Sequence, residues 1–334
     1  MCFMCAADFK SACKKAGIAL IVIFVARCLA DGAVYLIGLL MDGCNRQLVA
    51  SLQSLASILI LYVGAITVTA KALGHRFDKS VYNKPKRFGK AISWFVPAYG
   101  ASQIANIAVL LISFVFASNS SAVQQTYEPM IHATQTVGVW YLAFLFIQMV
   151  VLAPIFEEYW FRGVIQGSLS QYGNGFAIVV SALCFGMAHG NIHQLCYCFI
   201  MGIVVGYVRY ATGSILPTTI IHAMLNSISG IVIVAINTPL FTSAVIKLQK
   251  SVPLDDGEQA LLVCLAIFLL IVLIVLGAGI AAAIGKLKNN RIYRPVNNYP
   301  TLSSKQKAAT VCKNPIFIIG FLLCAVYITA MIFI

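Results

Sequence analysis

Charged residues are scarce in this chain of 334 residues. Asp, Glu, Lys and Arg together make up only 10% of it, whereas 60% of the residues are hydrophobic. So small a polar fraction cannot cover the surface of a water-soluble globule of this length, which excludes the ordinary soluble classes of protein. Acidic residues are fewer than basic ones, with 10 Asp and Glu against 23 Lys and Arg, and the formal net charge is +13.

Several motifs are absent as well. The chain has no internal repeat, no low-complexity tract and no Gly-rich loop of the kind that binds phosphates, and it lacks the HExxH motif of zinc proteases. Cys2 and Cys5 form a single CxxC with no second pair to complete a metal site. Most of the other cysteines lie inside apolar runs, where a thiol behaves as a small hydrophobic group.

The most prominent feature of the sequence is a series of long apolar runs. Each is about twenty residues long, enough to cross a hydrocarbon core of ~30 Å as a helix. The runs are 17–41, 51–74, 91–118, 137–156, 194–211, 216–236, 259–285 and 315–334, with a shorter ninth at 175–189. We therefore predict an all-α fold, a polytopic membrane helix bundle of about eight or nine transmembrane helices, in contact with the lipid bilayer.

The basic residues are sorted by loop rather than gathered on one face. Lys and Arg are concentrated in the segment before the first run, in 75–90 and in 286–314, and the last of these loops has no acidic residue. The positive-inside rule then places the N-terminus and both basic loops in the cytoplasm. This sorting explains the net charge without a nucleic-acid partner.

Three parts follow from the distribution of polar residues. Residues 1–136 form N-terminal transmembrane helices, 137–236 form a polar core, and 237–334 form a C-terminal transmembrane pair joined by a basic cytoplasmic loop. Outside the core, Arg27 and Asp31 are four apart on one helix and are expected to neutralise each other.

The core contains two adjacent carboxylates, Glu157 and Glu158, followed by Arg162. Ionisable groups in a membrane segment are costly unless they are paired or hydrated, so they mark candidate functional sites. Glu158 and Arg162 are four residues apart and face each other on a helix, whereas Glu157 is rotated by about 100°. The spacing therefore predicts a Glu158–Arg162 ion pair and leaves Glu157 as the candidate general base.

Two further pairs of residues bring polar groups into the same core. Phe185 and His189 are four apart on the short run, and His222 and Asn226 are four apart on another run. Polar groups in hydrocarbon need partners, and the nearest partners are one another. Such a cluster can hold a water between a carboxylate and an imidazole and can donate hydrogen bonds to an oxyanion, as in a hydrolase without a Ser or Cys nucleophile.

These three motifs, EExxxR, FxxxH and HxxxN in that order, resemble the CPBP or Abi family of intramembrane proteases, which includes the CAAX prenyl endopeptidase of eukaryotes. The resemblance covers about 137–236. It implies that Glu157 and His189 activate the attacking water, that His222 and Asn226 stabilise the oxyanion, and that Glu158 and Arg162 support Glu157. It also implies cleavage of a membrane-associated peptide or protein near the cytoplasmic side.

Alternatives to this interpretation remain open. His193 follows His189 by four and is a candidate supporting residue, although Gly190 and Asn191 are expected to break the helix between them. A carboxylate and two histidines are also a zinc ligand set, so a zinc-dependent protease is an alternative to one without a cofactor. A non-catalytic scaffold or transport protein is another. Bacterial relatives of the family include bacteriocin-immunity proteins, and we expect a bacterial plasma membrane and a bacterial substrate.

Overall fold

The computed structural model describes residues 6–117, 138–288 and 302–331. All regular secondary structure in these ranges is helical, so the predicted all-α class is confirmed. The first part contains α1 (Ala6–Leu40), α2 (Arg46–Ile58), η1 (Leu59–Ala65), α3 (Ile66–Leu73), η2 (Lys79–Tyr82), α4 (Phe88–Ile92) and α5 (Phe95–Ala117). The second contains α7 (Val139–Ile147), η3 (Gln148–Leu152), α8 (Ala153–Glu158), η4 (Tyr159–Ile165), α9 (Gln166–Ser170), α10 (Asn174–Ala188), α11 (Ile192–Thr212), α12 (Leu216–Ile236), α13 (Pro239–Gln249) and α14 (Asp256–Lys288). The third contains α15 (Ser304–Cys312) and α16 (Pro315–Ala330).

Six helices in the described part of the chain are long and apolar enough to cross a membrane. A seventh is added if α15 and α16, which are bent by 71° at their junction, count as one span. The predicted count of eight or nine is therefore not confirmed, while the polytopic helical bundle is. The short run at 175–189 forms α10, whose 15 residues give a helix of about 22 Å, less than the ~30 Å of a hydrocarbon core.

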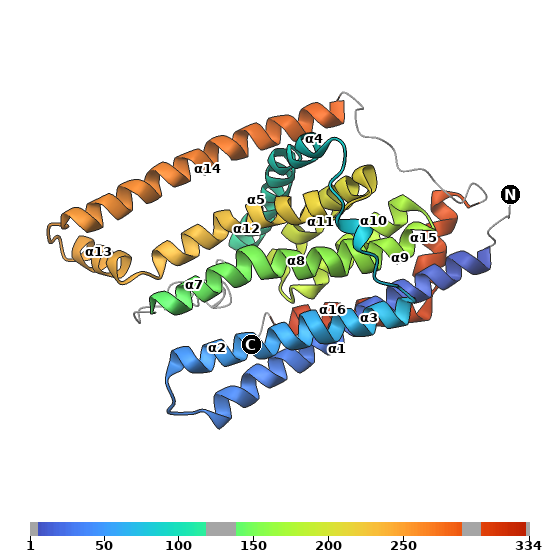
Figure 1. The fold of residues 1–334 in the computed structure, drawn as a ribbon, viewed down its shortest axis with the longest axis horizontal. Coiled ribbons are helices and arrows are strands. Elements are labelled where there is room, and N and C mark those ends of the chain that lie inside the picture. The colour runs from blue at the N-terminus through green and yellow to red at the C-terminus, as the bar shows by residue number, and fades with distance from the viewer. Residues whose placement is uncertain (1–5, 118–137, 289–301, 332–334) are drawn as a thin grey trace.

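Two of the spans are continuous rods that contain wide helical turns. Residues 46–73 join α2, η1 and α3, and residues 139–170 join α7, η3, α8, η4 and α9. The segments η1, η3 and η4 are π-helical, a geometry that is rare and frequently found at functional sites. Figure 1 shows the α3 end of the first rod beside α8 and α9 of the second, and Trp160 Nε1 joins the rods by donating to Thr69 Oγ1 at 3.1 Å.

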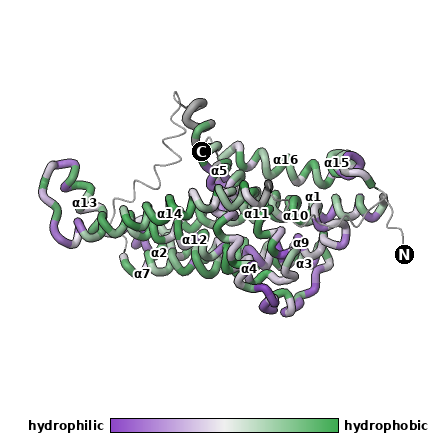
Figure 2. Tube along the Cα trace, turned by 90° about the horizontal axis from the view of Figure 1, so that it is seen from above, coloured by the Kyte–Doolittle hydropathy of each residue, from purple (hydrophilic) through white to green (hydrophobic). Residues whose placement is uncertain are grey.

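Close helix packing holds these rods in a bundle. α1 packs against α16, α5 against α14, and α10 against α11. The last pair depends on Gly202, because a Cβ there would lie 2.9 Å from Cα of Ala182. Figure 2 shows hydrophobic residues along α12 and α14, while hydrophilic residues gather near the connection between α3 and α4 and at the turn that follows α13. The long apolar helices and the polar turns are those of an integral, multi-pass membrane protein.

Candidate active site

The candidate residues come from three helices that meet inside the bundle. Glu157 and Glu158 end α8, His189 directly follows α10, and His222 lies on α12. Both imidazoles pack edge-on against one ring, Phe185, with ring centroids 4.9 Å away for His189 and 5.5 Å for His222. The structure therefore brings the two histidines together on Phe185.

Glu158 and Arg162 form the ion pair that their spacing predicts. Arg162 Nη1 lies 2.9 Å from Glu158 Oε1, and both side chains are 0% exposed. The guanidinium also lies 4.3 Å from the centre of the Phe185 ring, in a cation–π geometry. Its Nε and Nη2 have no hydrogen-bond partner among the described residues, so Glu158 and Phe185 supply most of its stabilisation.

His222 lies between the two carboxylates. Its Nδ1 is 3.0 Å from Glu158 Oε1, and its Nε2 is 3.7 Å from Glu157 Oε2. A carboxylate only accepts hydrogen bonds, so the contact with Glu158 places a proton on Nδ1. The distance to Glu157 is too long for a direct hydrogen bond, which leaves Nε2 available to a third group.

Glu157 differs from Glu158 in the solvent exposure of its side chain. Its side chain is 13% exposed, against 0% for Glu158, and it has no contact with Arg162. A water molecule can therefore reach Glu157 but not Glu158. The two adjacent carboxylates are chemically distinct, as their positions on the helix predict.

His189 is held by the end of α10. Its Nδ1 lies 2.8 Å from the carbonyl oxygen of Phe185, which can only accept, so the proton is on Nδ1 and Nε2 is left as an acceptor in the neutral ring. Gly190 follows with φ +72°, and Asn191 caps α11 by accepting from the Gln194 N–H at 2.8 Å. The predicted helix break after His189 is therefore present.

The two remaining candidates are Asn226 and His193. Asn226 Nδ2 donates to the carbonyl oxygen of Met149 at 2.9 Å, within the wide turn η3. This bond ties α12 to the rod that carries Glu157. His193 belongs to the first turn of α11, but its side chain lies outside the described part of the structure.

Tyr62 is a member of the site that sequence reasoning missed. Its hydroxyl donates to Glu157 Oε1 at 2.7 Å, and its ring stacks on Phe156 at 5.3 Å with an interplanar angle of 9°. It belongs to η1, within the apolar run 51–74, where a single tyrosine breaks no pattern. The available signal was chemical, because a hydroxyl within hydrocarbon needs a partner.

Arg27 and Asp31 make the contact expected of them, with Arg27 Nη2 3.5 Å from Asp31 Oδ1. Tyr327 of α16 joins the pair, accepting from Arg27 at 3.3 Å and donating to Asp31. The group packs against the turn after His189, because a Cβ on Gly190 would lie 2.9 Å from Tyr327 and 3.2 Å from Arg27. Helices α1 and α16 thus support this turn from outside the core.

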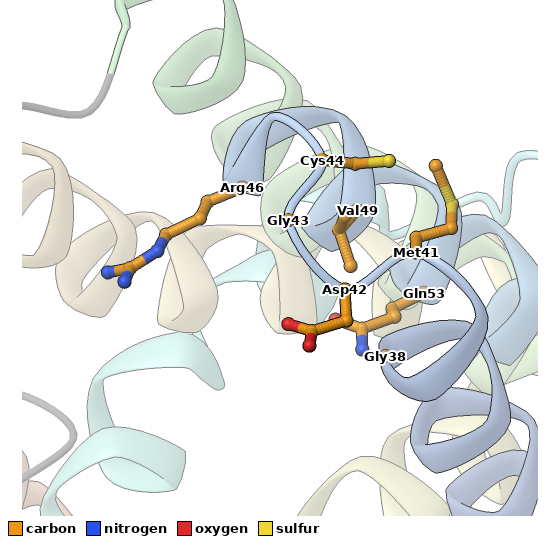
Figure 3. A pocket seen from close by; sticks show the side chains of 8 residues that line it. All are labelled: Gly38, Met41, Asp42, Gly43, Cys44, Arg46, Val49 and Gln53. Carbon is orange, nitrogen blue, oxygen red and sulfur yellow. The ribbon is translucent and has the colours of Figure 1, made fainter.

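We also searched the described residues for a metal-binding group and for pockets. No three His, Cys, Asp or Glu side chains within the described ranges are arranged as a metal-binding group. A pocket at the turn between α1 and α2 is lined by residues that include Asp42, Cys44 and Arg46 (Figure 3). None of the candidate site residues lines it, and the turn lies at the end of the helix pair remote from α8 and α10 (Figure 1).

Comparison with known proteins identifies the segment that carries the three motifs. Residues 138–228 match the family model described as type II CAAX prenyl endopeptidase Rce1-like, which covers under a third of the chain. No curated protein and no solved structure matches the chain. The match includes Glu157, Glu158 and Arg162, both histidines on Phe185, and Asn226, and it confirms the resemblance inferred from the motifs. Over residues 138–228 this chain is similar to the type II CAAX prenyl endopeptidases of the Rce1-like family.

Proposed function

We propose that this protein is an intramembrane endopeptidase of the glutamic type, in which Glu157 activates water to hydrolyse a peptide bond of a membrane-associated peptide or protein. The observation that carries the proposal is the difference between the two carboxylates. Arg162 holds Glu158 at 2.9 Å in a fully buried pair, while Glu157 stays 13% exposed beside a free imidazole nitrogen. A general base needs that access to water.

The first step forms the bond between the water oxygen and the carbonyl carbon. One water proton passes to Glu157 Oε2 as the carbonyl electrons move onto oxygen and create the oxyanion. His189 Nε2, left as an acceptor by the bond from Nδ1 to Phe185, accepts a hydrogen bond from the other O–H of the water, which stays on the oxygen, and so orients the water. The oxyanion then re-forms the carbonyl, the carbon–nitrogen bond breaks, and the leaving amine takes the proton held by Glu157.

Stabilisation of the oxyanion is assigned to His222 and Asn226. Glu158 accepts from Nδ1–H of His222, so in the imidazolium form the second donor, Nε2–H, is directed toward the reacting group rather than into the ion pair. Asn226 uses one N–H on Met149 and has a second to donate. Fixed donors of this kind lower the barrier because they need no rearrangement as charge develops. Glu158 and Arg162 act as support, and His193 remains a proposed supporting residue.

The substrate is proposed from the family and the topology. We place the protein in a bacterial plasma membrane with a cytoplasmic N-terminus, and its substrate among membrane-associated peptides or proteins. The family name supplies a first probe, a quenched fluorogenic farnesyl peptide that ends in a C-a-a-X sequence. Mass spectrometry of membrane peptides that accumulate in cells carrying Glu157→Gln supplies native candidates.

The test compares cleavage by purified wild-type protein and variants in lipid vesicles. Glu157→Gln and His189→Ala should each abolish cleavage while the protein stays folded, because each removes one of the two groups that bind the water. Asp256→Asn is the matched control, since this carboxylate is exposed at the start of α14. Cleavage at the wild-type rate by Glu157→Gln would refute the mechanism and return the protein to the scaffold or transport alternatives.

A cofactor is not needed for these steps, and the same assay tests the zinc alternative. We expect a strong chelator to leave the rate unchanged. Loss of activity on chelation that zinc restores, together with stoichiometric zinc in the purified protein, would replace the glutamic mechanism with a zinc-dependent one.

A further inference from the structure

We propose that Tyr62 is a positioning residue for Glu157, and that its hydroxyl decides which oxygen of this carboxylate takes the proton from water. Tyr62 belongs to η1, outside the 138–228 segment that matches the family. The inference rests on the proposed function. It adds that the N-terminal helices complete the catalytic site instead of only enclosing it.

The contacts of the two Glu157 oxygens are different. Oε1 accepts the Tyr62 hydroxyl at 2.7 Å, whereas Oε2 lies 3.7 Å from Nε2 of His222. The bond to Oε1 fixes the rotation of the carboxylate plane and directs Oε2 to the side where the two histidines meet on Phe185. Oε2 is therefore the oxygen that faces a water held there.

Tyr62 is itself held firmly. Its ring stacks on Phe156, the residue directly before Glu157, with centroids 5.3 Å apart and planes 9° from parallel. A side chain anchored on the neighbouring residue moves together with the carboxylate it binds. The wide turns η1 and η4 flank the site on the two rods, and α3, which continues η1, packs against η4. This packing keeps the donor in register with its acceptor.

The hydroxyl, rather than the ring, is the part that acts. A phenylalanine would keep the stacking on Phe156 and would suit the apolar run 51–74, so packing alone does not require an oxygen at position 62. A purely structural role would affect the stability of the bundle and leave turnover per folded molecule unchanged. A positioning role affects kcat and leaves KM unchanged, since Tyr62 is assigned no contact with substrate.

The experiment measures kcat and KM of Tyr62→Phe on the farnesyl C-a-a-X peptide, or on the native peptide that accumulates with Glu157→Gln. Hydrogen bonds to a charged group are among the stronger ones, so we expect kcat per folded molecule to fall about tenfold with KM unchanged. The matched control is Tyr35→Phe, whose side chain is 69% exposed on α1 and should behave as wild type.

A second arm asks whether Tyr62 acts through Glu157. Glu157→Asp withdraws the carboxylate by one methylene, so in that background Tyr62→Phe should lower kcat by less than about twofold. An unchanged or higher kcat in Tyr62→Phe, or an equal loss in the Glu157→Asp background, would overturn the inference and leave the mechanism intact. Wild-type protein that cleaves no peptide, or Glu157→Gln that cleaves normally, would instead overturn the proposed function itself.

Discussion

Removal of the Arg162 charge is the most direct test of how the buried pair is held. In Arg162→Met the apolar stem is retained, but Glu158 is left as an uncompensated charge in a site where both side chains are 0% exposed. Breaking a buried ion pair by removing one partner costs about 3–5 kcal/mol. The cation–π contact with Phe185 at 4.3 Å is lost as well, which adds about 1 kcal/mol. We therefore expect the free energy of unfolding to fall by roughly 4–6 kcal/mol.

The double variant Arg162→Met with Glu158→Gln separates charge from shape. It removes both charges and keeps an acceptor oxygen for Nδ1 of His222, which lies 3.0 Å from the carboxylate. Most of the lost stability should return, because the cost of the single change is that of an unpaired buried charge. The assay is reversible unfolding in mixed micelles, with cleavage measured on the folded protein. A loss below about 1 kcal/mol in Arg162→Met, or no recovery in the double variant, would refute this reasoning.

Two further predictions concern residues near the histidines. Gly190→Ala should destabilise the protein by roughly 1–2 kcal/mol and lower kcat, because φ +72° disfavours a side chain and the new Cβ would lie 2.9 Å from Tyr327. Thermal unfolding and steady-state kinetics measure both effects. Gly175→Ala is the control, since a Cβ at Gly175 would have open space around it. Asn226→Ala should lower kcat about 10²–10³-fold with little change in KM if its second N–H binds the oxyanion. Steady-state kinetics measure this, with Asn237→Ala as the control, because the side-chain amide of Asn237 donates to the Ile233 carbonyl. Equal kcat values for the two variants would contradict a role of Asn226 at the oxyanion.

The shapes of the apolar segments show where the sequence was insufficient for the fold. Hydropathy located the apolar runs because a helix in lipid must be apolar over most of its length. It located 175–189 as a short run, which forms α10, but it could not tell that 315–334 follows a 71° bend after α15. The wide turns η1, η3 and η4 were also beyond prediction, because π-helical geometry depends on contacts with neighbouring helices rather than on residue pattern.

The candidate site also has a part that the sequence predicts and a part that it does not. The Glu158–Arg162 pair and the break after His189 could be predicted because both are local: one is a contact between residues four apart on a helix, the other a property of Gly190. The partners of Tyr62 and Asn226 were not predictable. Their acceptors lie 95 and 77 residues away along the chain, and nothing in either local pattern indicates them.

The sequence by itself determined the membrane as the solvent, the helical class and the three motifs on which the similarity to CAAX-type endopeptidases rests. Those properties depend on composition and on spacing along one helix. Only the tertiary structure decided that His222 lies between two carboxylates, 3.0 Å from one and 3.7 Å from the other, and that a tyrosine from the second span binds Glu157. Such contacts depend on how separate helices cross, and that is set by the packing of the whole bundle.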